Sequence, residues 1–387
     1  MSFDTIVNRR GTGCYKWDNS EDPDMLPMFV ADMDFQVAPA ITKALIQRVN
    51  HGVYGYVKLL PDFYEAIVHW NKRRHDWTIQ PDTILATNGI VPAISAILRA
   101  LTKPGDGVMI QTPVYNCFFH DIEQNNCTIV ENPLIYDIPN RTYVIDFDDF
   151  EAKAADPNTR IFILCNPHNP VGRVWHREEL ARMAEICLKH DVLMISDEIH
   201  CDIIMPGHSY TPFATLSDEV RQKLITCISP SKAFNIAGLQ IAAVVIDNPE
   251  IRERVEYCFH VNGIWGVNAM GVEALKAAYN ESEGWLEAVN AYIWENYQML
   301  HRMMTAQMPE FPIIKLEGTY LAWVDCSALG LDSSEIDEML KTQGHLYINH
   351  GGIYGDPGKH FIRINLACPR ALLEEGVRRI IKTLCKR

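Results

Sequence analysis

The sequence predicts an α/β protein with a large, mostly parallel sheet and a smaller α+β lobe. Between about residues 82 and 246, short apolar runs alternate with segments of helical periodicity; the runs cover residues 107–110, 161–164, 192–195, 224–228 and 241–246. Runs this short and evenly apolar fit strands buried on both faces, and helices between them imply parallel connections. Because ligands of such sheets bind at the carboxyl ends of strands, we expect functional side chains directly after these runs.

The pattern changes after about residue 284. Longer amphipathic stretches follow, at 285–308 and 332–342, with strand-like pieces near 319–324 and 361–366. This pattern is typical of a smaller α+β lobe. We expect a large domain of residues 46–283 and a second unit formed by residues 1–45 and 284–387. The first forty-odd residues have weak periodicity, and they either wrap onto the small lobe or onto a partner subunit.

Composition excludes several classes of protein. Hydrophobic residues make up 48% of the 387 residues and charged residues 22%, the balance of a folded globular chain. The net charge of −14 argues against a general nucleic-acid or anionic-membrane surface. Without a signal-peptide pattern or a membrane-length apolar run, we expect a cytoplasmic protein. The eleven cysteines contain no C-x-x-C pair, so we expect buried reduced thiols and no metal site.

Lys232 is a candidate for a chemically reactive side chain. It lies in the segment 229–234, which directly follows the apolar run 224–228, with Ser229 and Ser231 close by. A lysine amine condenses with carbonyl compounds, its pKa falls readily on burial, and the two hydroxyl groups could face a phosphorylated ligand. Taken alone, however, this pattern is more typical of a solvated loop lysine.

Three other segments begin at or near strand ends and have two interpretations each. Asp197, in Ser-Asp-Glu-Ile-His, could pair with a protonated ring nitrogen of a cofactor or cap a helix. Asn169 lies in a Pro- and Asn-rich segment, 165–172, whose amide groups could hydrogen-bond a phenolic oxygen or which could form a simple turn. The segment 87–94 places glycine and then proline at a helix start, where free N–H groups could bind a phosphate or have no ligand at all.

Together these four segments resemble, in content and order, the pyridoxal-phosphate enzymes of the aspartate-aminotransferase fold. The resemblance covers nearly the whole chain, from Val-Ala-Asp-Met-Asp-Phe at 30–35 to Arg-Ile-Asn at 363–365. The motifs N-P-x-N-P-x-G and S-x-S-K are rarely found together elsewhere. The resemblance implies the aspartate-aminotransferase-like fold, pyridoxal 5'-phosphate as cofactor, and a homodimer with shared active sites.

The resemblance also implies roles in cofactor binding. Lys232 would attach the cofactor covalently and later move the proton at the substrate Cα. Asp197 would hold the protonated pyridine nitrogen, which keeps the ring an electron sink. Asn169 would donate to the phenolate oxygen, and the ring of Tyr115 would stack on the pyridine. The phosphate would be held by two hydroxyl groups and two backbone N–H groups, those of Ser229, Ser231, Ile90 and Val91.

Substrate binding follows from the same resemblance. Arg363 would clamp the α-carboxylate with its planar guanidinium group, and the backbone of Ala31 would close over that carboxylate. Asn169 would lie beside the substrate as well as the cofactor. Tyr56, or less readily Tyr54, would reach the phosphate of the neighbouring subunit.

Within the fold, the chain is most similar to the bacterial C–S β-lyases of the MalY/PatB type. His200 stands where many aminotransferases have tyrosine, and it is expected at the cofactor. Gln240 stands where they usually have a phosphate-binding arginine, so the serines, the helix start and the neighbour's tyrosine become more important. Val-Tyr-Gly-Tyr at 53–56 resembles an aromatic-Gly-Tyr element of these lyases.

The resemblance implies a lyase that performs α,β-elimination on L-cystathionine or related cysteine thioethers and yields a thiol, pyruvate and ammonia. An aminotransferase of the same fold is the first alternative, because both reactions begin with the same carbanion. A regulatory protein that retains the cofactor is the second.

Overall fold

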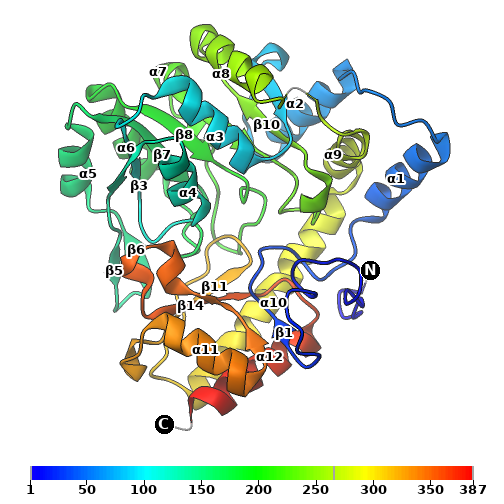
Figure 1. Ribbon diagram of the computed structural model, residues 1–387, viewed down its shortest axis with the longest axis vertical. Coiled ribbons are helices and arrows are strands. Elements are labelled where there is room, and N and C mark those ends of the chain that lie inside the picture. The colour runs from blue at the N-terminus through cyan, green and yellow to red at the C-terminus, as the bar shows by residue number, and fades with distance from the viewer. Residues whose placement is uncertain (1, 265, 386–387) are drawn as a thin grey trace.

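The computed structural model describes residues 2–264 and 266–385, and its largest element is a seven-stranded sheet (Figure 1). In spatial order the strands are β2 (Ile84–Thr87), β10 (Ala242–Val245), β9 (Leu224–Ile228), β8 (Leu193–Asp197), β7 (Thr159–Cys165), β3 (Gly107–Ile110) and β4 (Thr128–Glu131). The strands from β9 to β4 run parallel, whereas β10 is antiparallel to both β9 and β2. The prediction of an α/β protein with a mostly parallel sheet is confirmed.

All five predicted strands are present, but the direction of β10 departs from a purely parallel pattern. Between β9 and β10 the described chain contains only the short 3-10 turn η3 (Ala237–Leu239) and no crossover helix. Parallel neighbours need a crossover of a dozen or more residues, usually helical, so the chain returns in the opposite direction here. The two edge strands, β2 and β4, were not predicted; each has residues that are not buried, and each carries at most three apolar residues in a row.

Alternate residues of the central strands supply two separate cores. On β7, Ile161 and Ile163 pack with one cluster of buried apolar residues, and Phe162 and Leu164 pack with the other. Successive strand side chains point to opposite faces, so β7 is apolar throughout because both faces are covered. The first face is covered by α3 (Ile90–Leu101), α4 (Cys117–Gln124) and α8 (Pro249–Val261).

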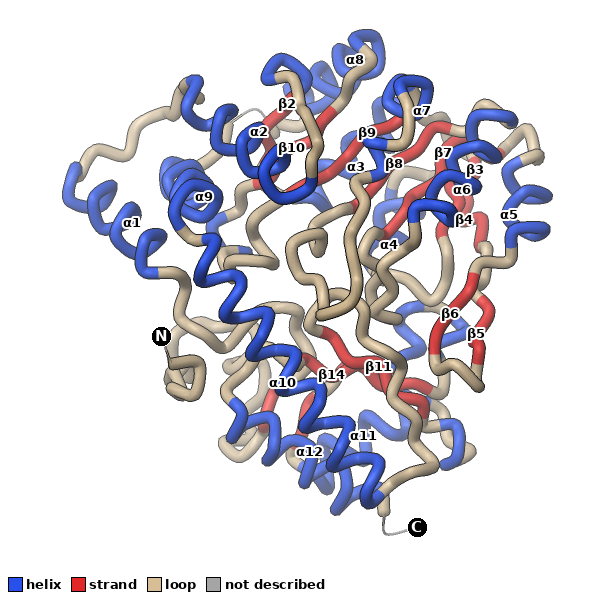
Figure 2. The backbone as a smooth tube through the Cα atoms, turned by 180° about the vertical axis from the view of Figure 1, so that it is seen from behind, coloured by secondary structure: helices blue, strands red, loops and turns tan. Residues whose placement is uncertain are grey.

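The second face of the sheet packs against a different set of helices, with α1 lying outermost on α9. They are α1 (Pro39–His51), α2 (Pro61–His75), α5 (Phe147–Ala154), α6 (Arg177–Lys189), α7 (Asp218–Gln222) and α9 (Ala269–Glu281). From α9 the long helix α10 (Glu283–Gln307) continues towards the carboxyl-terminal part of the chain (Figure 2).

The carboxyl-terminal part is built on a small antiparallel sheet, in the order β11 (Leu321–Asp325), β14 (Phe361–Asn365) and β13 (Asn349–His350). The helix α12 (Arg370–Leu384) packs against both α10 and α11 (Ser333–Gly344). A separate hairpin joins β5 (Ile135–Asp137) to β6 (Thr142–Val144). None of the described helices combines the length and apolarity that crossing a membrane requires.

The start of the chain wraps onto this carboxyl-terminal part. β1 (Leu26–Pro27) pairs in parallel with β12 (Leu346–Tyr347). Of the two alternatives that the sequence left open, the structure therefore shows the small lobe as a docking place of the amino-terminal segment. All eleven cysteines lie in the described residues and are free, and eight of them are buried, as predicted.

We predict that Gly351→Ala strongly destabilises the fold, whereas its neighbour Gly352→Ala does not. A Cβ atom at Gly351 would overlap the carbonyl oxygen of Gly358 and lie 2.6 Å from that of Phe361; at Gly352 the nearest atom lies 3.5 Å away. Overpacking of this kind costs about 1–3 kcal/mol or more. Denaturant unfolding followed by circular dichroism measures the difference, and equal midpoints for the two variants would contradict the prediction.

Candidate active site

Three neighbouring parallel strands end at one pocket of about 370 Å³. Cys165 ends β7, Asp197 ends β8, and Lys232 follows β9 by four residues. The start of α3 forms another part of the wall, and Arg363 of β14 reaches the same pocket from the small antiparallel sheet. The structure thus brings the candidate side chains of these strands together at the carboxyl edge of the parallel sheet.

Lys232 is partly buried and lines the pocket. Its Nζ donates a hydrogen bond of 2.8 Å to the carbonyl oxygen of Ala31, which also accepts a bond of 2.8 Å from the Tyr320 hydroxyl. Burial, followed by the nearby charge of Arg363, lowers the pKa of Lys232 below its ordinary value. A lowered pKa increases the fraction of neutral amine, which is the nucleophilic and basic form.

Asp197 is a buried acid at the end of β8. Its Oδ1 accepts a hydrogen bond of 3.1 Å from the backbone N–H of Ile199. Burial is the main cause that raises the pKa of Asp197 to about 7. A buried carboxylate is costly unless a cation pairs with it, so this position suits a protonated ring nitrogen.

Arg363 and Asn169 are in direct contact. Arg363 Nη1 donates to Asn169 Oδ1 at 3.0 Å, and Nη2 donates to the Phe29 carbonyl oxygen and to Asn349 Oδ1, both at 2.7 Å. Among the described residues, the buried Nε has no hydrogen-bond partner. The guanidinium group is therefore held in one orientation while one of its donors stays free for a ligand.

The segment with Ala31 is anchored by a cluster of four charged side chains. Lys16 Nζ lies 2.7 Å from Asp34 Oδ2 and 3.3 Å from Asp32 Oδ1, and Arg9 pairs with both of these acids. Lys16 and Asp34 are almost fully buried. Burial alone would favour the neutral forms, but the opposite charges lower the pKa of Asp34 and raise that of Lys16. The cluster keeps the 30–35 segment over the pocket.

The start of α3 offers free backbone N–H groups to the pocket. Gly89 has a φ of 155° and precedes Ile90, where α3 begins without a capping side chain. Ile90 and Val91 both line the pocket, together with Gln240. Unpaired N–H groups and the helix dipole together favour an anion such as a phosphate.

The two predicted phosphate-binding serines differ in their surroundings. Ser229 is buried, and its Oγ donates a hydrogen bond of 2.8 Å to the Ile241 carbonyl oxygen and accepts one of 3.1 Å from the Ser231 backbone N–H. Both serines line the pocket. The hydroxyl proton of Ser229 is thus donated to a group of the protein itself, the Ile241 carbonyl.

Tyr115 and His200 complete the wall. Burial is the main cause that raises the pKa of Tyr115 well above its ordinary value, so its ring is a neutral aromatic surface in the pocket. His200 Nδ1 is buried and has no hydrogen-bond partner among the described residues. Burial holds the pKa of His200 well below its usual range, so the ring is neutral.

These groups fit pyridoxal phosphate. The pocket combines a partly buried amine, a buried acid able to hold a ring nitrogen, and a helix start able to hold a phosphate. The unpartnered Nδ1 of His200 is a polar atom that a bound molecule would satisfy, since buried polar groups are almost always hydrogen-bonded.

The structure of one chain does not bring Tyr56 or Tyr54 to this pocket. Tyr56 is 99% exposed, and Tyr54 donates its hydroxyl proton to the Val49 carbonyl oxygen at 2.9 Å. Neither lines the pocket.

Two supporting residues of the site were not predicted. Tyr320 positions Ala31 by donating a hydrogen bond to its carbonyl oxygen, and Asn349 positions Arg363 by accepting one from its guanidinium group. Asn349 faces Arg363 only through the register of β13 on β14, which no local pattern reveals. The apolar pattern of 319–324 indicated the strand around Tyr320, but not the bond of its hydroxyl.

Comparisons with known proteins agree with this geometry. The profile of the family "Aminotransferase class I and II" matches residues 23–380. "Cystathionine beta-lyase PatB" of Bacillus subtilis is 41% identical over 98% of this chain and 99% of its own length. The structure of cystalysin from Treponema denticola, which contains pyridoxal 5'-phosphate, has a TM-score of 0.96 and 36% identity, and covers 99% of this chain and 98% of that one.

A third relative points in the same direction. The pyridoxal-phosphate-bound C–S lyase from Staphylococcus hominis has a TM-score of 0.92 and 33% identity, and it covers 100% of both chains. The pocket, the family profile and these full-length relatives lead to one assignment. The chain belongs to the family of class I and II aminotransferases and, within it, to the pyridoxal-phosphate-dependent carbon–sulfur lyases.

Proposed function

We propose that this enzyme performs α,β-elimination on L-cystathionine or a related cysteine thioether. One molecule of thioether and one of water give a thiol, pyruvate and ammonia. The observation that carries the proposal is the convergence of Lys232, Asp197 and Arg363 on one pocket. The full-length similarity to a protein named cystathionine β-lyase supports the choice of substrate.

The substrate would be bound by residues that come from several parts of the chain. Arg363 would clamp the α-carboxylate, because its fork is already oriented by Phe29 and Asn349. Asn169 touches Arg363 and would hold both the substrate and the phenolic oxygen of the cofactor. The backbone of Ala31, held over Lys232, would close the site.

The proton transfers fall to Lys232. When bound, pyridoxal phosphate supplies an electron sink for the carbanion at the substrate Cα. The neutral Lys232 Nζ takes the Cα proton, the Cβ–S bond breaks, and the same amine can return the proton to the departing sulfur. Asp197 would stabilise a proton on the ring nitrogen as its carboxylate counter-ion, and the first turn of α3 with Ser231 would hold the phosphate.

We further propose a cytoplasmic homodimer in which Tyr56 enters the partner's site. Tyr56 is fully exposed in the single chain, and further large apolar side chains of the α1 to α2 region are also exposed: Ile46, Val49, Val53, Tyr54 and Leu60. So many exposed large apolar side chains within one short segment are typical of an interface. A two-fold axis would bring each Tyr56 to the other subunit.

Elimination predicts product formation without a keto acid. With L-cystathionine or a small S-alkyl cysteine, the purified holoenzyme should release pyruvate and free thiol in equal amounts over many turnovers. A lactate dehydrogenase assay measures pyruvate, and a thiol reagent measures the second product. Activity that stops after one half-reaction until a keto acid is added, with no thiol released, would overturn the lyase proposal.

Replacing the reactive amine should abolish turnover. Lys232→Ala removes both the covalent attachment of the cofactor and the Cα base, so kcat should fall by about 10⁴-fold or more. Lys223→Ala, at an exposed ion pair with Asp191, is the matched control and should keep full activity. Mass spectrometry after borohydride reduction checks the attachment point; a cofactor still linked to the Lys232→Ala chain would exclude the assigned role.

Removing the Tyr56 hydroxyl should weaken cofactor retention. A hydrogen bond to a charged phosphate contributes about 1.5–3 kcal/mol, so Tyr56→Phe should raise the cofactor dissociation constant by about 10- to 100-fold. Tyr54→Phe is the control, because its hydroxyl already bonds the Val49 carbonyl. Equilibrium dialysis measures retention and light scattering measures assembly. A fully active monomer would contradict the shared-site proposal.

A further inference from the structure

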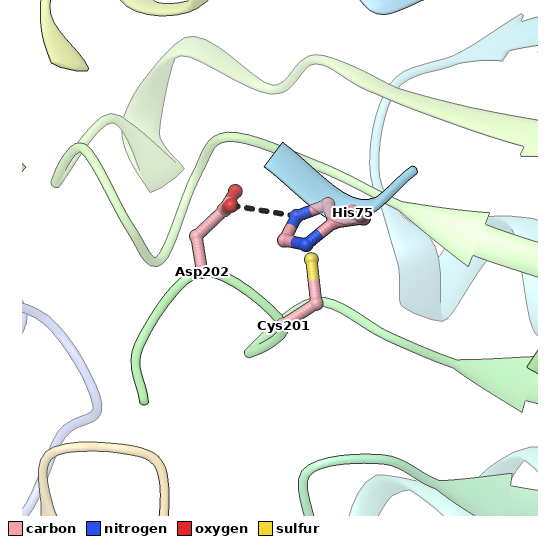
Figure 3. A group of neighbouring side chains, drawn as sticks. All are labelled: His75, Cys201 and Asp202. Carbon is pink, nitrogen blue, oxygen red and sulfur yellow. Dashed lines mark hydrogen bonds and ion pairs between the residues drawn. The ribbon is translucent and has the colours of Figure 1, made fainter. Parts of the chain in front are cut away.

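A second group of potential ligands lies behind the cofactor pocket, where α2 ends (Figure 3). His75 is the last residue of α2, and Cys201 and Asp202 lie in the turn that directly follows His200. One ligand atom from each of these three side chains lies within 4.8 Å of the other two. Figure 3 shows the His75 ring between the Asp202 carboxylate and the Cys201 sulfur.

The three side chains are well buried but face a space that solvent can enter. The exposed fraction is 7% for the His75 side chain, 2% for that of Asp202 and 6% for Cys201. All three line a pocket of about 460 Å³ that is separate from the Lys232 pocket. An ion could therefore enter with water, while the packed surroundings hold the donors in place.

We propose that His75, Cys201 and Asp202 form a binding site for a divalent cation of the zinc class. Imidazole nitrogen, thiolate sulfur and carboxylate oxygen are the donors that zinc uses. In a tetrahedral zinc site such donors lie about 3.3–3.8 Å apart, given metal–ligand distances of about 2.0–2.3 Å. His75 Nε2 and Asp202 Oδ1 lie 2.9 Å apart, and the three ligand atoms all lie within 4.8 Å of one another, which is close to that spacing. Water from the pocket would supply the fourth ligand.

The existing contacts of Asp202 are compatible with an ion. Asp202 Oδ2 accepts a hydrogen bond of 3.1 Å from the Trp70 indole N–H. Each carboxylate oxygen has two lone pairs, so this bond can remain and orient the carboxylate as a ligand. The ion would replace only the hydrogen bond between His75 and Asp202.

The nearby cation Arg74 does not block the site. Arg74 lines the same pocket, but its guanidinium group pairs with Glu283 at 3.1 Å and with Glu287. These two acids compensate its charge. The sequence predicted no metal site, because His75 and Asp202 are separated by 127 positions and no short cysteine spacing marks them.

Cobalt(II) is a direct probe of this site, because a cobalt–thiolate bond has a charge-transfer absorption band. The holoenzyme, first treated with a chelator, should bind one Co²⁺ per chain and develop this band. Cys201→Ser should abolish the band, and His75→Gln should weaken Co²⁺ binding by about 10- to 100-fold. Zn²⁺ should displace Co²⁺ and remove the absorption.

Controls separate this site from the other cysteines and histidines. Cys385→Ser removes an exposed thiol and His120→Gln an exposed imidazole, so both variants should bind Co²⁺ like the parent enzyme. The absorption spectrum of the bound cofactor and the unfolding midpoint confirm that each variant is folded. Co²⁺ binding without the charge-transfer band, or binding unchanged in both Cys201→Ser and His75→Gln, would overturn the proposal, as would no saturable binding.

Discussion

Burial of an amine and an acid at the same sheet edge is the constraint on which the rest of this structure depends. Lys232 and Asp197 lie on neighbouring strand ends, and burial pushes both towards their neutral forms. Such groups are costly in a protein interior unless something pairs with them. The sheet tolerates this cost because both of its faces are covered by apolar helices, which hold the strand ends rigidly in place.

Residues from outside this sheet complete the site. Arg363 comes from the small sheet, and Phe29 and Ala31 come from the amino-terminal segment. Each group reaches the pocket through a directional hydrogen bond to another segment. The pocket therefore joins three separate parts of the fold, and its geometry depends on how they dock on one another.

Local patterns predicted the central strands well, because a strand buried on both faces must be apolar at every position. The runs at 107–110 and 224–228 coincide with β3 and β9. The same reasoning fails for β4, whose ends are exposed at the sheet edge, and for the direction of β10, which depends on a connection without a helix. Neither feature leaves a mark in the local apolar pattern.

The clustering of the candidate residues Lys232 and Asp197 was also predictable, since both lie at or shortly after strand ends and stand in motifs that rarely occur together outside this fold. Their supporting partners were not. Asn349 reaches Arg363 only through strand register, and the His75, Cys201 and Asp202 group forms only when α2 packs beside the turn after β8. Contacts between distant segments leave no local signature. The surroundings of Tyr56 were not predictable from local patterns either, because a second chain would form them.

The pairing of β1 with β12 has a consequence for how the enzyme is made. Residues 26–27 emerge from the ribosome long before their partners at 346–347 and before Arg363. The large sheet can fold during synthesis, since domains generally fold as units as the chain lengthens. The carboxylate clamp and the segment over Lys232 cannot assemble until the two ends of the chain meet. Substrate binding therefore has to wait until the chain has been synthesised beyond β12 and Arg363.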